Sequence, residues 1–111
     1  MAAKFEIKMT ANGQYMFNLE AGNGEVILTS EMYKAKSSAK NGIRSVKENA
    51  VKPERFKELT AANGMPYFVL RAGNYQVIGR SEMYSSDSAM KNGMESVMRN
   101  APYAEVVDLT K

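Results

Sequence analysis

An internal duplication constrains this chain more than any other feature of its sequence. Residues 5–50 align with residues 56–101 at a constant offset of 51, without a gap, and 23 of the 46 aligned positions are identical. Agreement of this extent predicts two copies of one structural unit. A third, partial copy follows, because residues 105–110 resemble residues 55–60. We therefore predict a single domain over residues 1–111, made of repeat 1 (5–50), repeat 2 (56–101) and a closing strand (104–110).

Each repeat opens with the pattern of short antiparallel strands. Apolar and charged residues alternate from Lys4 to Met9, which is the period of a half-buried strand. Asn12-Gly13 and its counterpart Asn63-Gly64 predict a type I′ turn, with positive φ at both residues, that joins this strand to a second. Another turn, which ends at Gly24 in copy one and at Tyr75 in copy two, leads into a third strand. The opening of each repeat is thus a three-stranded meander.

The period then changes to that of a helix. Small and apolar residues recur every three or four positions, in copy one at Ala35, Ala39, Ile43, Val46 and Ala50. Ser37 and Ser88 are predicted as N-cap residues, since a serine hydroxyl can accept from a free backbone amide. Gly42 and Gly93 fall in mid-helix, where glycine costs about 1 kcal/mol relative to alanine. We therefore expect each helix to approach something closely there, most simply the sheet.

These patterns predict an α+β fold. Two tandem β-β-β-α(-β) repeats should share one antiparallel-type sheet, with both helices packed on one face, because one meander and one helix are too small to bury their own apolar surface.

Four motifs that occur twice resemble the YegP-like family. They are the Asn-Gly hairpin, the Ala-Gly-Asn turn, the Ser-Glu-Met-Tyr block and the helix sequence Gly-Ile/Met-x-Ser-Val. The resemblance is to the duplicated form of the family and covers residues 5–110. It implies one continuous sheet with the terminal strands exchanged between the units, an arrangement that single-copy relatives reach by dimerising. It implies no activity, substrate or cofactor, because the family consists of bacterial proteins of unknown function.

Composition excludes many classes of function. The chain has no Cys, His or Trp, so disulfides, thiolate or imidazole metal sites and catalysis by Cys or His are absent. We assign no metal and no cofactor, and we expect no enzyme activity, because no nucleophile, base and oxyanion donor can be named together. No window approaches the roughly 18 apolar residues of a membrane helix. Without a signal-peptide pattern, a cytoplasmic location is expected.

The duplicated Ser-Glu-Met-Tyr block is a candidate ligand site or a structural motif. It falls where the third strand hands over to the helix, a place where side chains often gather into sites. A partly buried Glu beside a Tyr hydroxyl could act as an acid–base pair. The same residues could equally serve the fold, with Met and Tyr under the helix and Ser and Glu satisfying backbone donors at its start. The candidate residues are Ser30, Glu31, Tyr33, Ser81, Glu82 and Tyr84.

Nucleic-acid binding has two candidate surfaces. The net charge is +3 with a pI near 9.2, which is a small basic surplus. The first surface is a basic stripe on the first helix, formed by Lys36, Lys40, Arg44 and Lys47; its counterparts in repeat 2 are not all basic, which weakens it. The second is the outer sheet face, where Met16, Asn18, Tyr67, Val69 and Arg71 should project and could stack bases.

The leading hypothesis is a small non-catalytic module that binds or assembles with an unidentified protein partner. Nucleic-acid association through the basic stripe is the alternative. Met98, which aligns with Lys47 and lies off the apolar stripe, would mark a partner surface if it is exposed. The duplication predicts a monomer with internal pseudo-twofold symmetry, because two joined copies can complete the sheet between themselves.

Overall fold

Seven strands and two α-helices follow one another in the order that the repeats predict. The computed structural model describes residues 2–111. Repeat 1 forms β1 (Lys4–Met9), β2 (Tyr15–Glu20), β3 (Val26–Thr29) and α1 (Lys36–Asn49), and repeat 2 forms β4 (Phe56–Thr60), β5 (Pro66–Arg71), β6 (Val77–Arg80) and α2 (Asp87–Asn100). Two short 3-10 helices, η1 (Pro53–Arg55) and η2 (Ala101–Tyr103), precede β4 and β7 (Glu105–Asp108).

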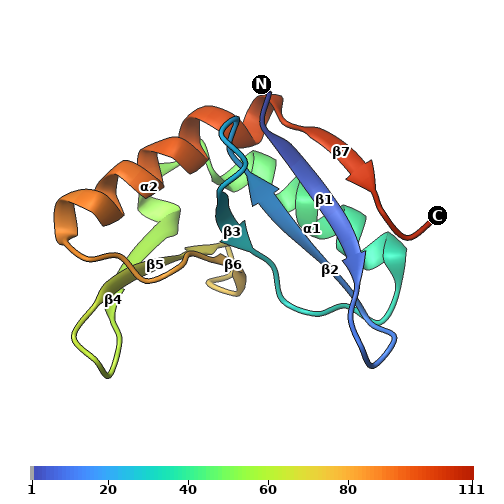
Figure 1. Ribbon diagram of the computed structural model, residues 1–111, viewed down its shortest axis with the longest axis horizontal. Coiled ribbons are helices and arrows are strands. Elements are labelled where there is room, and N and C mark those ends of the chain that lie inside the picture. Colours follow the sequence, from blue (N-terminus) through green and yellow to red (C-terminus); the bar gives the residue numbers. More distant parts are fainter. Residues whose placement is uncertain (1) are drawn as a thin grey trace.

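All strands belong to one sheet in the order β4-β5-β6-β3-β2-β1-β7 (Figure 1). The two meanders meet at β3 and β6, where Thr29 pairs with Arg80. These two residues are related by the offset of 51, so the pseudo-twofold axis of the repeats passes between them. The predicted α+β fold with tandem repeats in one sheet is confirmed.

One strand pair makes the sheet mixed. The pairings within each meander and across the axis are antiparallel, whereas β7 runs parallel to β1, with Lys4 opposite Glu105. The chain reaches β7 from α2, on the other repeat, and a strand that arrives through a helical crossover can run parallel. The last strand of repeat 2 thus lies on repeat 1 (Figure 1), which is the exchange that the resemblance implies.

Both helices cover the same face of the sheet and each reaches across the axis. Helix α1 packs on β2, β5 and β6, and α2 packs on β3 and β5. Between helices and sheet lies one apolar core whose largest members include Phe5, Phe17, Phe68, Leu19 and Leu70. No helix of residues 2–111 covers the opposite face of the sheet, and we call it the outer face.

The hairpin turns differ from the predicted type I′ geometry. Gly13 has φ of 84° and its amide donates to the Thr10 carbonyl, but Asn12 does not have positive φ. The loop is therefore a three-residue turn that ends in a left-handed glycine, which is the next most common hairpin connection. Asn63-Gly64 repeats it. The prediction of two positive φ angles was wrong, because an Asn-Gly pair also suits a turn that needs only the glycine.

The predicted helix caps were also wrong. Helix α1 begins at Lys36 after Ala35, which supplies no side-chain cap, and α2 begins at Asp87 after Ser86. The Ser86 hydroxyl accepts from the Ala89 amide at 3.1 Å. Ser37 and Ser88 lie inside the first turn, because each helix starts two residues before the position expected.

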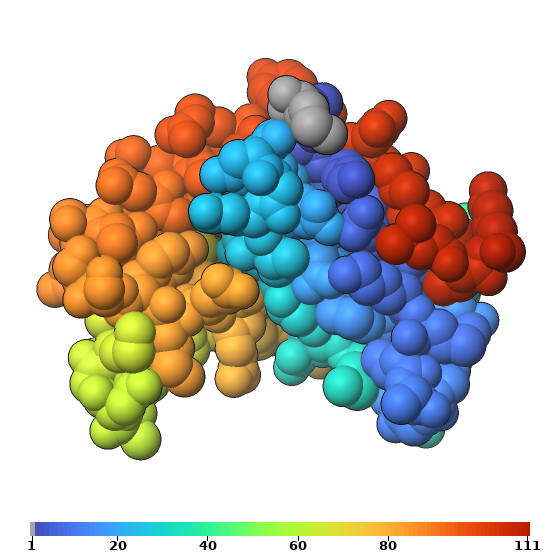
Figure 2. Space-filling model, viewed as in Figure 1, coloured from blue at the N-terminus to red at the C-terminus, as the bar shows by residue number. Residues whose placement is uncertain are grey.

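The space-filling surface is arched (Figure 2). The β1–β2 and β4–β5 hairpins project toward the same side at opposite ends of the molecule, and the surface is hollowed between them.

Each α-helix has 14 residues. Within residues 2–111, no helix is long and apolar enough to cross a membrane.

Candidate functional site

Ser30 and Ser81 bind the third strand of each repeat to the second. The Ser30 hydroxyl accepts a hydrogen bond from the Phe17 amide at 2.8 Å and donates to the Glu31 carbonyl at 2.7 Å. Ser81 makes the two equivalent bonds at 2.9 and 2.8 Å. Both serines are buried. The backbone donor that they satisfy lies on the neighbouring strand, not at the start of the helix as expected.

Tyr33 and Tyr84 pack beneath the helices at the two mid-helix glycines. A Cβ on Gly42 would lie 2.6 Å from the Tyr33 hydroxyl, and one on Gly93 would overlap the hydroxyl of Tyr84. The Tyr33 ring also lies nearly parallel to that of Phe17, with centroids 6.4 Å apart. The close approach at both glycines is therefore first to a tyrosine ring. At Gly42 a Cβ would also lie 3.0 Å from the ring of Phe17 on β2, so the expected approach to the sheet is met there as well.

The acid–base interpretation of the Ser-Glu-Met-Tyr block lacks its physical basis. Burial raises the pKa of the Tyr33 and Tyr84 hydroxyls, and the negative charges of Glu31 and Glu82 raise them further. Both phenols are therefore protonated at neutral pH. Glu31 and Glu82 are exposed, so neither is the partly buried carboxyl group that the acid–base interpretation requires.

The methionines of the block are exposed as well, Met32 at 62% and Met83 at 54%, where packing under the helix was expected. Glu31 and Tyr33 line a hollow of about 390 Å³, and Glu82 and Tyr84 are not among its lining residues. Among residues 2–111 no three carboxylates gather where they could hold a metal ion.

The basic stripe on α1 is partly occupied by contacts within the chain. The Lys36 ammonium lies 2.9 Å from the Asp108 carboxylate of β7 and 5.9 Å from the centre of the Tyr15 ring. Lys47 lies over the ring of Phe5 at 5.8 Å. Only Lys40 and Arg44 of the four are exposed.

Asp108 is the most strongly perturbed acid of the described residues. The hydroxyl of Thr110 donates to it at 2.6 Å and the Thr110 amide at 2.8 Å. These bonds, together with the ion pair to Lys36, hold the pKa of Asp108 far below its usual range. The carboxylate thus links β7 to α1, and Lys36 is part of the fold rather than a free cation.

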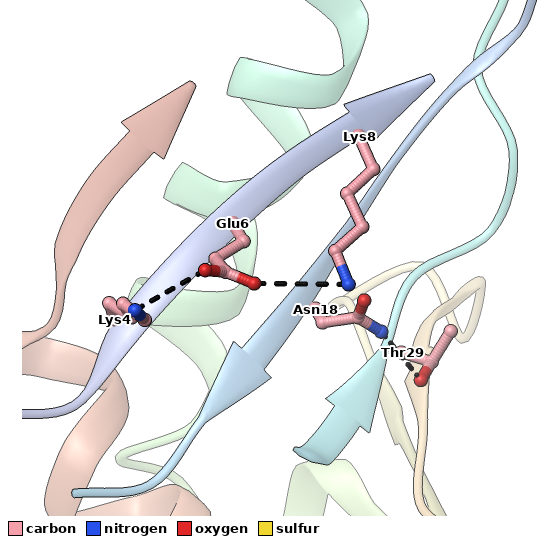
Figure 3. Close-up of polar contacts among 5 residues, drawn as sticks. All are labelled: Lys4, Glu6, Lys8, Asn18 and Thr29. Atoms are coloured by element: carbon pink, nitrogen blue, oxygen red, sulfur yellow. Dashed lines mark hydrogen bonds and ion pairs between the residues drawn. The ribbon is translucent and has the colours of Figure 1, made fainter. Parts of the chain in front are cut away.

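The polar side chains on the outer face of repeat 1 pair with one another (Figure 3). Glu6 lies between two lysines, 3.3 Å from Lys4 and 3.8 Å from Lys8. On the next strands the Asn18 amide donates to the Thr29 hydroxyl at 3.0 Å. Hydrogen bonding to Glu20 and then to Lys4 lowers the pKa of Glu6, and the same bond raises the pKa of Glu20. Cations and anions are balanced on this face.

The outer face of repeat 2 carries cations at the equivalent positions. The offset of 51 places Arg55 at the position of Lys4, Lys57 at that of Glu6 and Arg71 at that of Glu20, while Leu59 replaces Lys8 and Arg80 replaces Thr29. At these five positions repeat 1 carries two cations and two anions, whereas repeat 2 carries four cations and no anion. Both acidic partners have been exchanged for basic residues.

Aromatic rings lie among these cations. The Arg80 guanidinium lies 6.0 Å from the centre of the Tyr67 ring, and the Arg71 guanidinium lies 5.1 Å from that of Tyr75. Val69 is only 3% exposed although it stands outside the helix-side core, so neighbouring side chains cover it. We name the set Arg55, Lys57, Tyr67, Arg71, Tyr75 and Arg80 the basic–aromatic face.

Sequence reasoning found only part of this face. Tyr67, Val69 and Arg71 were expected on the outer face, but Arg55, Lys57, Tyr75 and Arg80 were not singled out. The signal that could have found three of them is the comparison of the two copies, because Lys57, Tyr75 and Arg80 differ in charge or type from their counterparts, whereas Arg55 keeps the charge of Lys4. Met98, in contrast, is half-buried against the core, so the exposure that would mark a partner surface is missing.

Comparison with known proteins identifies the family. The model of the "Domain of unknown function (DUF1508)" family matches twice, at residues 11–56 and 61–108. A UPF0339 protein of Acinetobacter baylyi is 52% identical over 110 residues, which are 99% of each chain. The UPF0339 protein YegP of Yersinia pestis is 53% identical over 106 residues, 96% of this chain and 95% of that one.

Two solved structures share the whole fold. The solution NMR structure of a UPF0339 protein from Shewanella oneidensis has a TM-score of 0.92 at 49% identity and covers 98% of this chain and 92% of its own. That of E. coli yegP, described as a protein of unknown function, has a TM-score of 0.92 at 45% identity, with 98% and 94% covered. No activity is named for these relatives. The chain belongs to the DUF1508 family, in the tandem-repeat form that the UPF0339 proteins such as YegP represent.

Proposed function

We propose that this protein is a non-catalytic binding module and that its basic–aromatic face binds single-stranded nucleic acid. One observation carries the proposal: within a single chain, the same sheet face is neutralised in repeat 1 and left cationic in repeat 2. Because the two faces share one backbone arrangement, the fold itself does not require the cations of repeat 2.

The chemistry of the face suits a single strand. Proteins that bind single strands combine cations along the phosphate backbone with aromatic rings on which bases stack. Tyr67 and Tyr75 supply rings, and each has an arginine beside it. Tyr75 is 74% exposed, so one face of the molecule offers an aromatic surface to solvent. In this proposal the protein meets the nucleic acid in the cytoplasm, which is the location expected for the protein from its sequence.

The other surfaces considered support binding less well. On α1, Lys36 pairs with Asp108 and Lys47 covers Phe5, which leaves two exposed cations, Lys40 and Arg44. A protein partner docked at Met98 would need that side chain to be accessible, and it packs on the core. We therefore propose the outer face of repeat 2 in place of the helix stripe.

The test is fluorescence anisotropy with a labelled single-stranded oligonucleotide of about 12 nucleotides, within the range that small sheet domains cover. If Arg55, Lys57, Arg71 and Arg80 each neutralise one phosphate, the logarithm of the affinity should fall with the logarithm of the salt concentration with a slope of about −3. A slope near zero would contradict the proposal.

A matched pair of variants locates the surface. Lys57→Glu with Arg80→Thr installs the residues of repeat 1. The affinity for the oligonucleotide should fall, and the magnitude of the salt slope should decrease by about 1.4. Lys40→Thr with Arg44→Glu changes the net charge by the same amount on α1 and should leave both values close to those of the unmodified protein. If the α1 variant loses binding and the sheet variant does not, the helix stripe is the site.

We also propose that the protein acts as a monomer, since β3 and β6 join the two meanders within one chain. Light scattering should then give the mass of one chain, 12.3 kDa. A mass of twice that value at low micromolar concentration would contradict it.

A further inference from the structure

A pocket lies at one corner of the basic–aromatic face, where the turn between β5 and β6 meets the segment before β4. It has a volume of about 260 Å³ and is lined by Glu54, Arg55, Arg71, Ala72, Gly73 and Tyr75. Two guanidinium groups and one carboxylate line it, so the lining carries a net positive charge.

Arg55 is held in position by groups that leave most of its donors free. Its Nη1 donates to the Oδ1 of Asn49 at 3.0 Å, and the amide group of Asn49 is itself fixed by a bond to the Ser45 carbonyl at 2.8 Å. The same guanidinium lies against Gly73, where a Cβ would stand 2.7 Å from Nη1. Arg55 is thus a preorganised cation.

Arg71 has a buried donor without a partner. Among residues 2–111, its Nε is inaccessible to solvent and makes no hydrogen bond. Buried polar groups are usually hydrogen-bonded, so the Nε of Arg71 is a donor that an anionic group bound in the pocket would satisfy. A pair of arginine forks is well suited to the oxygens of a phosphate.

Tyr75 completes the corner in a conformation that favours glycine. Its φ is 70°, and it is the one non-glycine residue with positive φ among residues 2–111. Repeat 1 has Gly24 at this position, with φ of 85°. The ring lies over the guanidinium of Arg71. A bulky residue in this region is strained, and such residues gather at binding sites.

Repeat 1 shows what the corner looks like without these features. There the equivalent residues are Lys4, Glu20 and Gly24, and Lys4 faces Glu20 across the β1–β2 pair. In repeat 2 the basic and the acidic residue are replaced by two arginines that line one pocket, and the turn glycine is replaced by an exposed tyrosine. All three changes favour one kind of ligand, an anion attached to a flat group.

We infer that Arg55, Arg71 and Tyr75 form a binding site for a phosphate ester, with the two guanidinium groups on the phosphate and the tyrosine ring stacked on the adjoining base. The inference rests on the proposed function and names the point at which the strand is held. The phosphate could also belong to a free mononucleotide, and the experiment separates these sources.

The experiment follows the Arg71 Nε–Hε signal and the Gly73 and Tyr75 amides by NMR during titration with inorganic phosphate, then adenosine monophosphate, then the oligonucleotide. Saturable shifts confined to the corner are expected, with tighter binding for the mononucleotide than for phosphate because of stacking. Arg71→Glu, which installs the residue of repeat 1, should weaken phosphate binding about tenfold or more, as expected for loss of a charge-assisted bond.

Three further variants separate charge from geometry. Arg71→Lys keeps the charge but has no fork, and it should lose most of the phosphate response. Glu54→Gln should tighten binding by removing repulsion. Lys57→Ala lies outside the pocket lining and should keep the phosphate response while weakening the oligonucleotide. Equal phosphate binding by Arg71→Lys and the unmodified protein would overturn the forked geometry.

The outcomes also separate this inference from the proposed function. Oligonucleotide shifts across β4 to β6 without any response of the corner to phosphate or mononucleotide would overturn the phosphate site and leave the function standing. A corner response to mononucleotide without oligonucleotide binding would keep the site and overturn the function. No response to any of the three would overturn both.

Discussion

Leu28 and Gly79 are counterparts in the two repeats, and they meet at the pseudo-twofold axis. A Cβ on Gly79 would lie 2.6 Å from Cγ and Cδ2 of Leu28. Both positions are buried. Two leucines would not fit beside the axis, so one copy keeps the large side chain and the other has none. The symmetry of the fold is therefore broken by packing at its own centre.

Gly79→Ala should destabilise the protein by about 1–3 kcal/mol, because the added methyl group overpacks the axis. Chemical denaturation measures the change. Leu28→Ala alone should also destabilise, by leaving a cavity. In the double variant the alanine at position 79 no longer meets a leucine, so the destabilisation caused by Gly79→Ala should largely disappear. Simple addition of the two single effects would contradict this packing.

Gly93→Ala should lower the free energy of unfolding by about 1–3 kcal/mol, although alanine is the better helix former, because its methyl group would overlap the hydroxyl of Tyr84. Asn92→Ala, at the neighbouring exposed position, is the matched control and should leave stability unchanged or raise it slightly. Thermal unfolding followed by circular dichroism compares the two. Equal behaviour of both variants would show that the glycine is not needed for close approach.

Asp108 should make the stability depend on acid pH. Its pKa is lowered in the folded state by Thr110 and by Lys36, so its contribution is complete above the unfolded value near 3.9. It is lost as the pH falls from there through the folded pKa. Urea midpoints of the unmodified protein and Asp108→Asn should differ at pH 7 and converge as the pH falls below about 4. A difference that is independent of pH would contradict the assignment.

Tyr75→Gly should be more stable than Tyr75→Ala by about 1 kcal/mol. Both variants remove the ring and its contact with Arg71, so the difference isolates the backbone, which has positive φ at this position. Denaturant unfolding of the two variants gives the comparison. If alanine proves as stable as glycine, the strain at residue 75 is absent.

Much of the fold could be predicted from the repeat and its periodicity. The alternation in β1 and the spacing of Ala39, Ile43 and Val46 follow directly from which faces must be buried. The turn type could not be predicted, because Asn-Gly suits a turn with one positive φ as well as one with two. Nor could the parallel β1–β7 pair be derived from local pattern, since the direction of a closing strand depends on where its helix ends.

The candidate site was less accessible to sequence reasoning. The Ser-Glu-Met-Tyr block drew attention because it is identical in both copies, yet Ser30 and Tyr33 prove to serve the strand pair and the helix glycine. Residues that are identical in the two copies are those that the fold requires in each repeat. The cations that stand out, Lys57 and Arg71, occur where the copies differ, and their meaning depends on which side chains face them across the sheet.

The most direct test of the account is to map the contact surface of the whole protein by NMR. Backbone amide shifts during titration with a single-stranded oligonucleotide should concentrate on β4, β5 and β6 and on the turn at Tyr75. The equivalent amides of β1, β2 and β3 should stay unchanged, because their side chains already neutralise one another. Shifts that are equal on the two repeats, or confined to α1, would contradict the claim that repeat 2 carries the binding face.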